Sequence, residues 1–436
     1  MSASMTNSLE ARVRGLIFGN TLWTGKPTTL YLAFFTSTTP PDETGAGSEY
    51  SGNGYARKAV ACNNTNWTVT DATVTNALAI KFANACTADW SGIAHWGLFD
   101  KATGGTLLFY GALKETRTFT QYSTANVPIG DFSITLGGAF GTWMANKILK
   151  YFFQAQTWVS VPTFYVGVGT NGDADQLYGE PLPYSGSPAT GYARGSIANT
   201  TAKWPTATAG AHQASNASAI ANFPEATADW GQLSYQALLS APIVTGAQYA
   251  SDTTLVTTSV TYSQTGYTIT VNKTSHGLNT GMAIWLSITS GLATEGYYTV
   301  TRIDNDNFTV TSPDSVSTTG AAQWEPYYIT VTATAHGLLS ELNAQTGNPQ
   351  HVDLWFQTKD ATNYFISRRY TIVYIVDSDN FIVNLEKEDE NGINSGESVT
   401  YSLADVIAYA PLTSAITVNN KDTTTVPANA LVASTD

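Results

Sequence analysis

Two stretches of the chain carry apolar residues at helical spacing, which predicts two short amphipathic helices. The first covers residues 7–22, with Asn7 as the expected cap and Glu10 as its reciprocal partner. The second begins near Thr142. The apolar stripes are Leu9, Val13, Leu16 and Ile17 in the first helix, and Met144, Ile148, Phe152 and Ala155 in the second. Each stripe is expected to cover one face or end of a β-sandwich.

Elsewhere apolar residues occur in short runs that are separated by Gly, Pro, Ser and Asn, a pattern typical of strands and turns. Extended runs fill 29–35 and 163–168, and 93–100 and 107–113 flank the turn at Gly104 and Gly105. The predicted class is therefore all-β with short helices, built from two tandem β-sandwich modules.

The tandem arrangement is predicted from an internal repeat. The tetrapeptide Gly-Tyr-Ala-Arg stands at 54–57 and again at 191–194, and Thr-Ala-Asp-Trp stands at 87–90 and again at 227–230. Two identical tetrapeptides in the same order indicate a duplication. A long loop rich in Gly, Pro and Ser precedes each Gly-Tyr-Ala-Arg stretch.

The second copy is predicted to be interrupted by an insertion. Its final strand resembles 107–113 but occurs only at 406–412, so about 159 residues lie inside the hairpin tip that matches Gly104 and Gly105. The inserted segment is itself repetitive: a Thr-Val strand, a His-Gly-Leu turn and an Asp-x-Asp-Asn turn occur twice. The expected domains are 1–138, 139–246 with 406–436, 247–318 and 319–405.

Composition and charge exclude several functions. The net charge is −13 and no Lys/Arg cluster occurs, which argues against nucleic-acid binding. The N-terminus has no secretory signal pattern, and no run of about 18 apolar residues would cross a membrane. Cys62 and Cys86 are expected to be partly buried thiols, and whether they pair is left open.

Each repeat offers an Arg on a strand and an Asp-Trp pair on a later loop. We expect Arg57 to meet Asp89 or neighbouring backbone carbonyls, and Arg194 to meet Asp229, because a guanidinium suits a buried ion pair. The alternative is a ligand site. The residues expected to stabilise the fold through these contacts are Tyr55, Arg57, Asp89, Trp90, Tyr192, Arg194, Asp229 and Trp230.

No pattern in the sequence predicts catalysis, a metal or a cofactor. The Asp-x-Asp-Asn turns at 304–307 and 377–380 lack the Gly and distal Glu of a calcium loop, so hairpin turns are expected. His276 and His336 precede Gly at strand ends, which indicates turn chemistry. Trp285, Trp324 and Trp355 in the insertion are candidate contacts for a sugar or a partner, although core packing is expected for at least two of them.

The repeat resembles a module of tailed-bacteriophage virion proteins of the minor tail or tail-fibre type. The resemblance rests on residues 29–36, 49–57, 88–100 and 107–136. It implies a non-enzymatic structural protein of the tail, baseplate or neck that binds other virion proteins, in a homo-oligomeric ring, trimer or hexamer. The implied location is the virion, assembled in the bacterial cytoplasm. A capsid decoration or head-fibre protein and a module for host surface glycans are the alternatives.

Overall fold

The computed structural model describes residues 3–19, 21–83, 85–138, 140–181, 191–205, 213–217, 223–251, 256–333, 351–357, 365–385, 398–419, 421–422 and 432–434. This part of the chain is almost entirely β, as predicted, with two helices, α1 (Asn7–Gly19) and α2 (Thr142–Phe153). The chain divides into two compact units. Unit 1 contains Met1–Pro181, Tyr192–Ala241 and Asp405–Asp436, and unit 2 contains Leu182–Gly191 and Pro242–Ala404. The main segment of unit 2 thus begins five residues before the expected start at 247.

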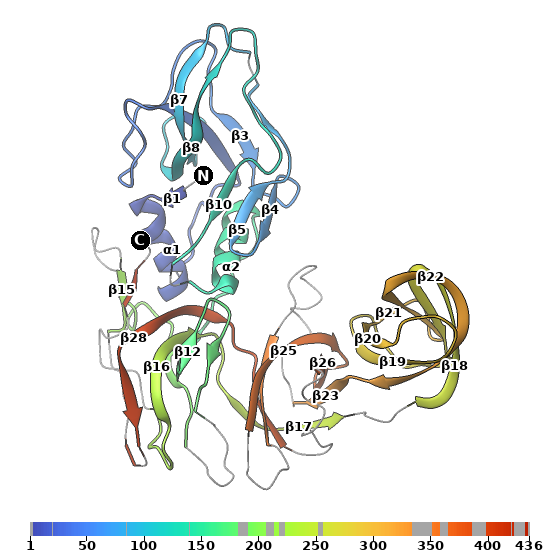
Figure 1. The fold of residues 1–436 in the computed structure, drawn as a ribbon. Coiled ribbons are helices and arrows are strands. Elements are labelled where there is room, and N and C mark those ends of the chain that lie inside the picture. Colours follow the sequence, from blue (N-terminus) through green and yellow to red (C-terminus); the bar gives the residue numbers. More distant parts are fainter. Residues whose placement is uncertain are drawn as a thin grey trace. The chain divides into compact units, whose positions relative to one another are not determined.

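The first module of unit 1, residues 3–138, is built on a five-stranded antiparallel sheet in the order β1-β8-β7-β2-β3 (Figure 1). Its strands are β1 (Ala3–Met5), β2 (Thr29–Thr36), β3 (Lys58–Ala61), β7 (Trp90–Phe99) and β8 (Leu107–Phe119). Smaller sheets are formed by β4 (Trp67–Thr70), β5 (Thr73–Asn76) and β10 (Ser133–Thr135), and by β6 (Ile80–Lys81) and β9 (Asn126–Val127).

The second module of unit 1 has a four-stranded sheet in the order β14-β11-β16-β28. Its strands are β11 (Thr163–Gly169), β14 (Gly195–Ala198), β16 (Gly231–Leu239) and β28 (Val406–Val418). Short pairs are formed by β12 (Asn171–Gly172) with β13 (Leu177–Tyr178), and by β15 (Gln213–Ser215) with β29 (Val432–Ser434). Read in chain order, β11, β14, β16 and β28 occupy the same positions as β2, β3, β7 and β8.

Unit 2 leaves the second module after β16 and returns at β28. Leu239 at the end of β16 pairs with Val406 at the start of β28, so the two ends of the insertion lie side by side. In the first module, Phe99 and Leu107 make the equivalent pair at the β7–β8 hairpin. An insertion at such a tip leaves the host sheet intact.

The N-terminal caps of both helices differ from those predicted. Thr6 precedes α1, and its carbonyl accepts a hydrogen bond from the Glu10 N–H. The Asn7 side-chain oxygen has no hydrogen-bond partner, and Glu10 forms an ion pair with Arg14 at 3.6 Å. The capping box predicted for Asn7 and Glu10 is therefore wrong. In α2 the cap position is Gly141, and Thr142 is already helical.

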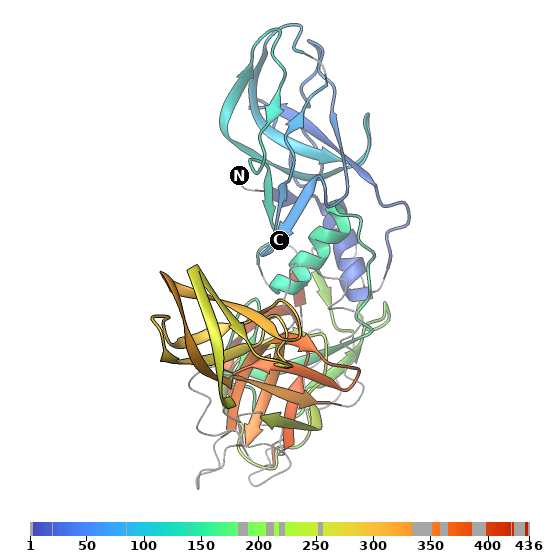
Figure 2. The ribbon, with the colours of Figure 1, turned by 90° about the vertical axis from the view of Figure 1, so that its right-hand side faces the viewer.

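The two helices lie side by side between the sheets of unit 1 (Figures 1 and 2). Each helix packs on both modules. Phe18 of α1 contacts Trp204 of the second module, with ring centroids 5.1 Å apart. Phe153 of α2 contacts Trp67 of the first module at 5.0 Å. The helix that leads each module thus fills the aromatic core of the other one, which joins the two modules into a single unit.

Hydrogen bonds also connect each helix to the other module. The Asn199 amide of the second module donates to the Ile17 carbonyl of α1 at 2.7 Å. The Ala72 N–H of the first module donates to the Asn146 side chain of α2 at 2.9 Å. Both helices therefore have buried hydrogen bonds as well as aromatic contacts with the module that does not contain them in sequence.

Unit 2 consists of a five-stranded sheet and a closed barrel. The sheet contains β18 (Val256–Asn272), β19 (Ala283–Ser290), β20 (Gly296–Thr299), β21 (Thr301–Arg302) and β22 (Asn307–Pro326). The barrel contains β17 (Val244–Ser251), β23 (Tyr328–Thr332), β24 (His351–Gln357), β25 (Phe365–Ile375), β26 (Asn380–Asn384) and β27 (Ser398–Ser402).

The boundary expected between residues 318 and 319 falls inside β22. This strand continues to Pro326 because its second half stays paired with β18 and β19, with Trp324 opposite Val256 and Leu286. The strand β17, expected in the first inserted domain, pairs with β23 and β27 of the barrel. The inserted repeat therefore does not divide the segment in the way that we predicted.

Candidate functional sites

A buried cluster of Arg, Glu and Tyr lies at the Gly-Tyr-Ala-Arg stretch of the first module. The Arg57 guanidinium forms an ion pair with the Glu49 carboxylate at 2.7 Å. It also donates to the carbonyls of Lys101 and Gly104 at the β7–β8 hairpin. The Tyr55 hydroxyl donates to Glu49 and accepts the Phe34 N–H of β2, both at 2.9 Å. The cluster therefore connects a long loop and a hairpin tip to strand β2.

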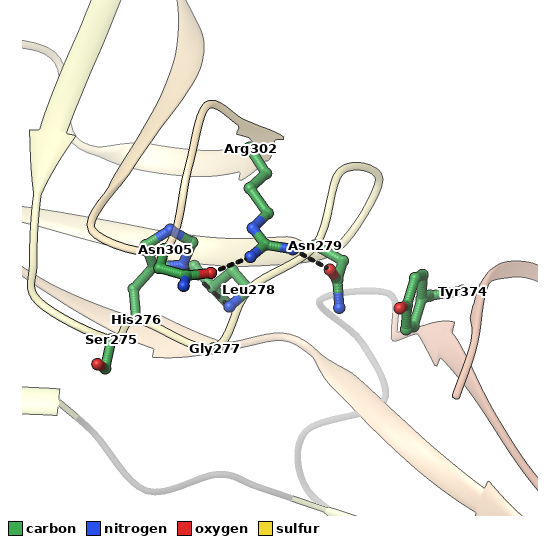
Figure 3. A pocket seen from close by; sticks show the side chains of 8 residues that line it. All are labelled: Ser275, His276, Gly277, Leu278, Asn279, Arg302, Asn305 and Tyr374. Atoms are coloured by element: carbon green, nitrogen blue, oxygen red, sulfur yellow. Dashed lines mark hydrogen bonds between the residues drawn. The ribbon is translucent and has the colours of Figure 1, made fainter. Parts of the chain in front are cut away.

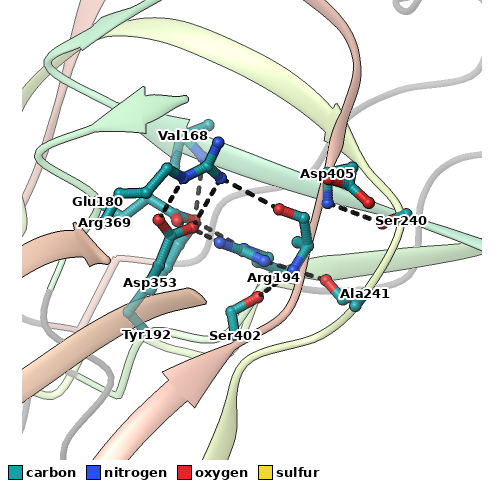
Figure 4. Close-up of polar contacts among 11 residues, drawn as sticks. Val168, Glu180, Tyr192, Arg194, Ser240, Ala241, Asp353, Arg369, Ser402 and Asp405 are labelled. Carbon is teal, nitrogen blue, oxygen red and sulfur yellow. Dashed lines mark hydrogen bonds and ion pairs between the residues drawn. The ribbon is translucent and has the colours of Figure 1, made fainter. Parts of the chain in front are cut away.

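The second module repeats this cluster in a more buried setting (Figure 4). Arg194 and Glu180 form an ion pair at 2.5 Å, with side chains only 1% and 3% exposed. Arg194 also donates to the Ala241 carbonyl at 3.0 Å, where the chain leaves β16. The Tyr192 hydroxyl donates to Glu180 at 2.7 Å and accepts the Val168 N–H at 3.1 Å. Burial raises the pKa of Tyr192 well above its ordinary value, so this hydroxyl stays protonated.

The predicted pairing of Arg57 with Asp89 is wrong. Asp89 lies just before β7, where its carboxylate accepts the Gln121 N–H at 2.7 Å. The carboxylate found on Arg194 is Glu180, in place of the predicted Asp229. The two Asp-Trp pairs are nevertheless close to their clusters through the ring contacts of Trp90 with Tyr55 and of Trp230 with Tyr192.

The two glutamates were missed because they lie at different distances from their arginines. Glu49 is eight positions before Arg57, whereas Glu180 is 14 positions before Arg194. A fixed-spacing motif cannot detect such a pair, since the two loops differ in length. The signal in the sequence was a Glu in each long loop before the Gly-Tyr-Ala-Arg stretch, although the first loop offers Glu43 as well as Glu49.

Two of the three candidate tryptophans can be assessed. Trp324 is 4% exposed and belongs to the core of the β18–β22 sheet, so it is not available to a sugar or a partner. Trp285 on β19 is half-buried. The side chain of Trp355 and all of His336 lie outside the described residues.

Two loops of unit 2 are locked together around His276. The Leu278 N–H donates to His276 Nδ1, and His276 Nε2 lies 3.0 Å from the Asp304 carbonyl. Because Nδ1 accepts a hydrogen bond, the proton must be on Nε2, which donates it to that carbonyl. His276 is 6% exposed and its ring also packs against Phe308. It holds the loop after β18 against the loop before β22.

A groove of about 370 Å³ lies beside these two loops (Figure 3). We call it the Arg302 groove, and its lining residues are Ser275, His276, Gly277, Leu278, Asn279, Arg302, Asn305 and Tyr374. The exposed Arg302 guanidinium donates to the Asp304 carbonyl at 3.1 Å, to the Asn279 amide oxygen at 3.2 Å and to the Asn305 amide oxygen. No carboxylate pairs with Arg302 among the residues that the structure describes.

The Asp-x-Asp-Asn turns are hairpin turns closed by their own first Asp. Asp304 accepts the Asp306 N–H at 2.8 Å, and Asp377 accepts the Asp379 N–H at the same distance. The backbone N–H of Asp306 holds the pKa of Asp304 below its ordinary value. No group of three or more His, Cys, Asp or Glu residues suited to a metal occurs in the described part of the chain.

The two cysteines are free and buried. Cys62 lies beside the Pro27 carbonyl, and burial raises the pKa of its thiol to about 11. A thiol with so high a pKa is a poor nucleophile at neutral pH.

The comparison with protein families decides the class of the molecule. The family described as Podophage GP4 fiber I protein gp80 matches residues 4–135 and 139–275, which together make up more than half of the chain. The chain belongs to this family. The fibre-family match spans the first module of unit 1, the second module up to β16, both Arg-Glu-Tyr clusters, and β17 and β18 of unit 2; β28 and β29 of the second module lie outside it.

Other comparisons add little to the family assignment. Among solved structures, the phage phi92 endosialidase is similar at 12% identity over 81% of this chain, with a TM-score of 0.15. The match covers 43% of that protein, and with so low a TM-score it carries no argument about this one. No curated protein matches. Within the described residues, neither helix is long and apolar enough to span a membrane.

Proposed function

We propose that this chain is a non-enzymatic structural component of a phage tail fibre, held in the virion by other virion proteins. The observation that carries the proposal is the fibre-family match over the first module and most of the second. The packing of Phe18 in the second module and of Phe153 in the first supports it, because these contacts hold the two modules together. A rigid pair of β modules is suited to bearing load in an assembly.

We further propose that unit 1 arose by duplication and provides the attachment surface. The shared strand order and the repeated Arg-Glu-Tyr cluster support a duplicated module. A tandem copy would fill two equivalent positions of a ring, so a homo-oligomeric ring would need half as many chains. An arrangement in which the two modules contact unrelated partners would contradict this role.

Unit 2 is proposed to project from that surface as the host-facing part of the protein. Its entry and exit strands are neighbours in the host sheet, so the insertion can vary without disturbing attachment. The tail, baseplate and neck all remain compatible with this role. A capsid decoration protein is less favoured, because the matching family is described as a fibre protein.

The experiment that tests this proposal is immunogold labelling of purified virions with antibodies raised separately against each unit. We expect antibodies against unit 2 to label the tail, and antibodies against unit 1 to label it only after the particles are disrupted. Absence of the chain from washed particles, judged by mass spectrometry, would overturn the proposal. Gold on the capsid surface would favour the decoration alternative.

A further inference from the structure

The polar groups of the Arg302 groove are arranged to donate hydrogen bonds. A guanidinium has no acceptor, so the amides of Asn279 and Asn305 must turn their oxygens toward it. Their NH₂ groups then face away from Arg302, as Figure 3 shows. Because Asn279, Arg302 and Asn305 all line the groove, a ligand that fits their remaining donors must supply acceptors.

The charge around the groove limits how acidic that ligand can be. Two carboxylates lie nearby, and both are already engaged: Asp304 by the Asp306 N–H and the Asn307 amide, and Asp306 by the Ser275 N–H. The chain as a whole carries a net charge of −13. A polyanion would be repelled, whereas a single carboxylate can bind the guanidinium with charge-assisted hydrogen bonds.

The far side of the groove is apolar and exposed. Tyr374 of β25 is 38% exposed, and Figure 3 places Asn279 between the Arg302 guanidinium and the Tyr374 ring. Ile303, which adjoins the same hollow, is 57% exposed. An accessible aromatic ring next to hydrogen-bond donors fits the flat apolar face of a sugar, whose hydroxyl oxygens also accept hydrogen bonds.

The groove is formed before any ligand arrives. His276 joins its two loops through Nε2, which lies 3.0 Å from the Asp304 carbonyl, and three neutral oxygens hold the guanidinium in place. Pre-organised donors lose little conformational entropy when a ligand binds. A shallow, open site of this kind is suited to weak binding of a single unit, with affinity gained from several copies.

We propose that the Arg302 groove binds a carboxylated sugar unit. Its carboxylate lies on the Arg302 guanidinium and the Asn279 and Asn305 amides, and its ring packs on Tyr374. That this unit belongs to a polysaccharide of the host surface rests on the proposed function. The binding chemistry itself does not, because it follows from the donors of the groove.

The test uses the purified full-length protein, with sodium glucuronate as the probe and glucose as its neutral counterpart. Saturation-transfer NMR should show saturable binding of glucuronate, and glucose should bind about tenfold more weakly because it lacks the charge-assisted contacts. Arg302→Gln should weaken glucuronate binding about tenfold, and Tyr374→Ala should weaken glucuronate and glucose by similar factors.

The matched control is Arg117→Gln, which removes the same charge from an exposed position on β8 of unit 1 and should leave binding unchanged. If Arg302→Gln lowers the melting temperature, Arg302→Lys is the second variant. It keeps the positive charge but lacks the planar pair of N–H donors of the guanidinium, so it should still weaken binding. Equal binding of glucose and glucuronate, or no effect at Arg302, would overturn the proposal. So would Arg302-dependent binding of a tetraglutamate peptide in place of glucuronate. None of these outcomes depends on where the chain sits in the virion.

Discussion

The Phe153 ring, at the end of α2, packs edge-on against the Trp67 ring of the first module with 5.0 Å between centroids. Its counterpart Phe18, 135 positions earlier, packs against Trp204 of the second module in a tilted geometry, with 5.1 Å between centroids. The aromatic core of each module therefore includes a ring from the helix that leads the other module. Neither module has a complete core on its own.

Truncating either ring should destabilise the whole of unit 1. We expect Phe153→Ala and Phe18→Ala each to lower its free energy of unfolding by about 3–5 kcal/mol, because both rings are fully buried. Urea denaturation followed by tryptophan fluorescence measures the effect. Leu22→Ala, at a side chain 61% exposed, is the control and should change stability by less than about 0.5 kcal/mol. If either variant destabilised one module and left the unfolding transition of the other unchanged, a shared interface would be contradicted.

The two Arg-Glu-Tyr clusters should differ in their contribution to stability because they differ in exposure. Glu180→Gln leaves the buried Arg194 charge uncompensated and should cost about 3–5 kcal/mol. Glu49→Gln should cost less, since the Glu49 side chain is 24% exposed and water can solvate Arg57 in its place. Parallel denaturation curves of both variants measure the difference. Equal costs would show that burial does not set the strength of these pairs.

Alkaline pH should destabilise the protein through Cys62. Its pKa is about 11 in the folded protein, above the value of about 8.5 for a free thiol. Between these values the folded state holds a proton that the unfolded state has lost, so stability must fall as pH rises from about 8.5 to 11. Denaturation of the reduced protein at a series of pH values measures the slope. In Cys62→Ala the slope over this range should be smaller, and an unchanged slope would contradict the assignment.

Much of the fold was accessible from the sequence because it depends on local pattern. Helical spacing located α1 and α2, and the repeated Gly-Tyr-Ala-Arg stretches lie at equivalent strands, just before β3 and β14. The packing of each helix in the core of the other module could not be predicted from the sequence, since the same apolar stripe could equally well cover its own module. Contacts such as Phe18 with Trp204 and Phe153 with Trp67 distinguish the two arrangements, and they are visible only in the structure.

The errors at the candidate sites have a common origin in contacts between distant residues. Asp89 was chosen as the partner of Arg57 because its Asp-Trp motif repeats, whereas the true partner, Glu49, lies in a loop of unequal length. The Arg302 groove also escaped notice, because Tyr374 reaches it from a strand some 70 positions away. Of the three candidate tryptophans, at least two were expected in the core, and Trp324 is buried there.

A cryo-EM map of the virion tests the central claim most directly. The account predicts that density matching unit 1, with α1 and α2 between its two modules, is buried among tail proteins, and that unit 2 points outward. Density for the chain on the capsid, or a unit 1 whose two modules are separated in the particle, would contradict it.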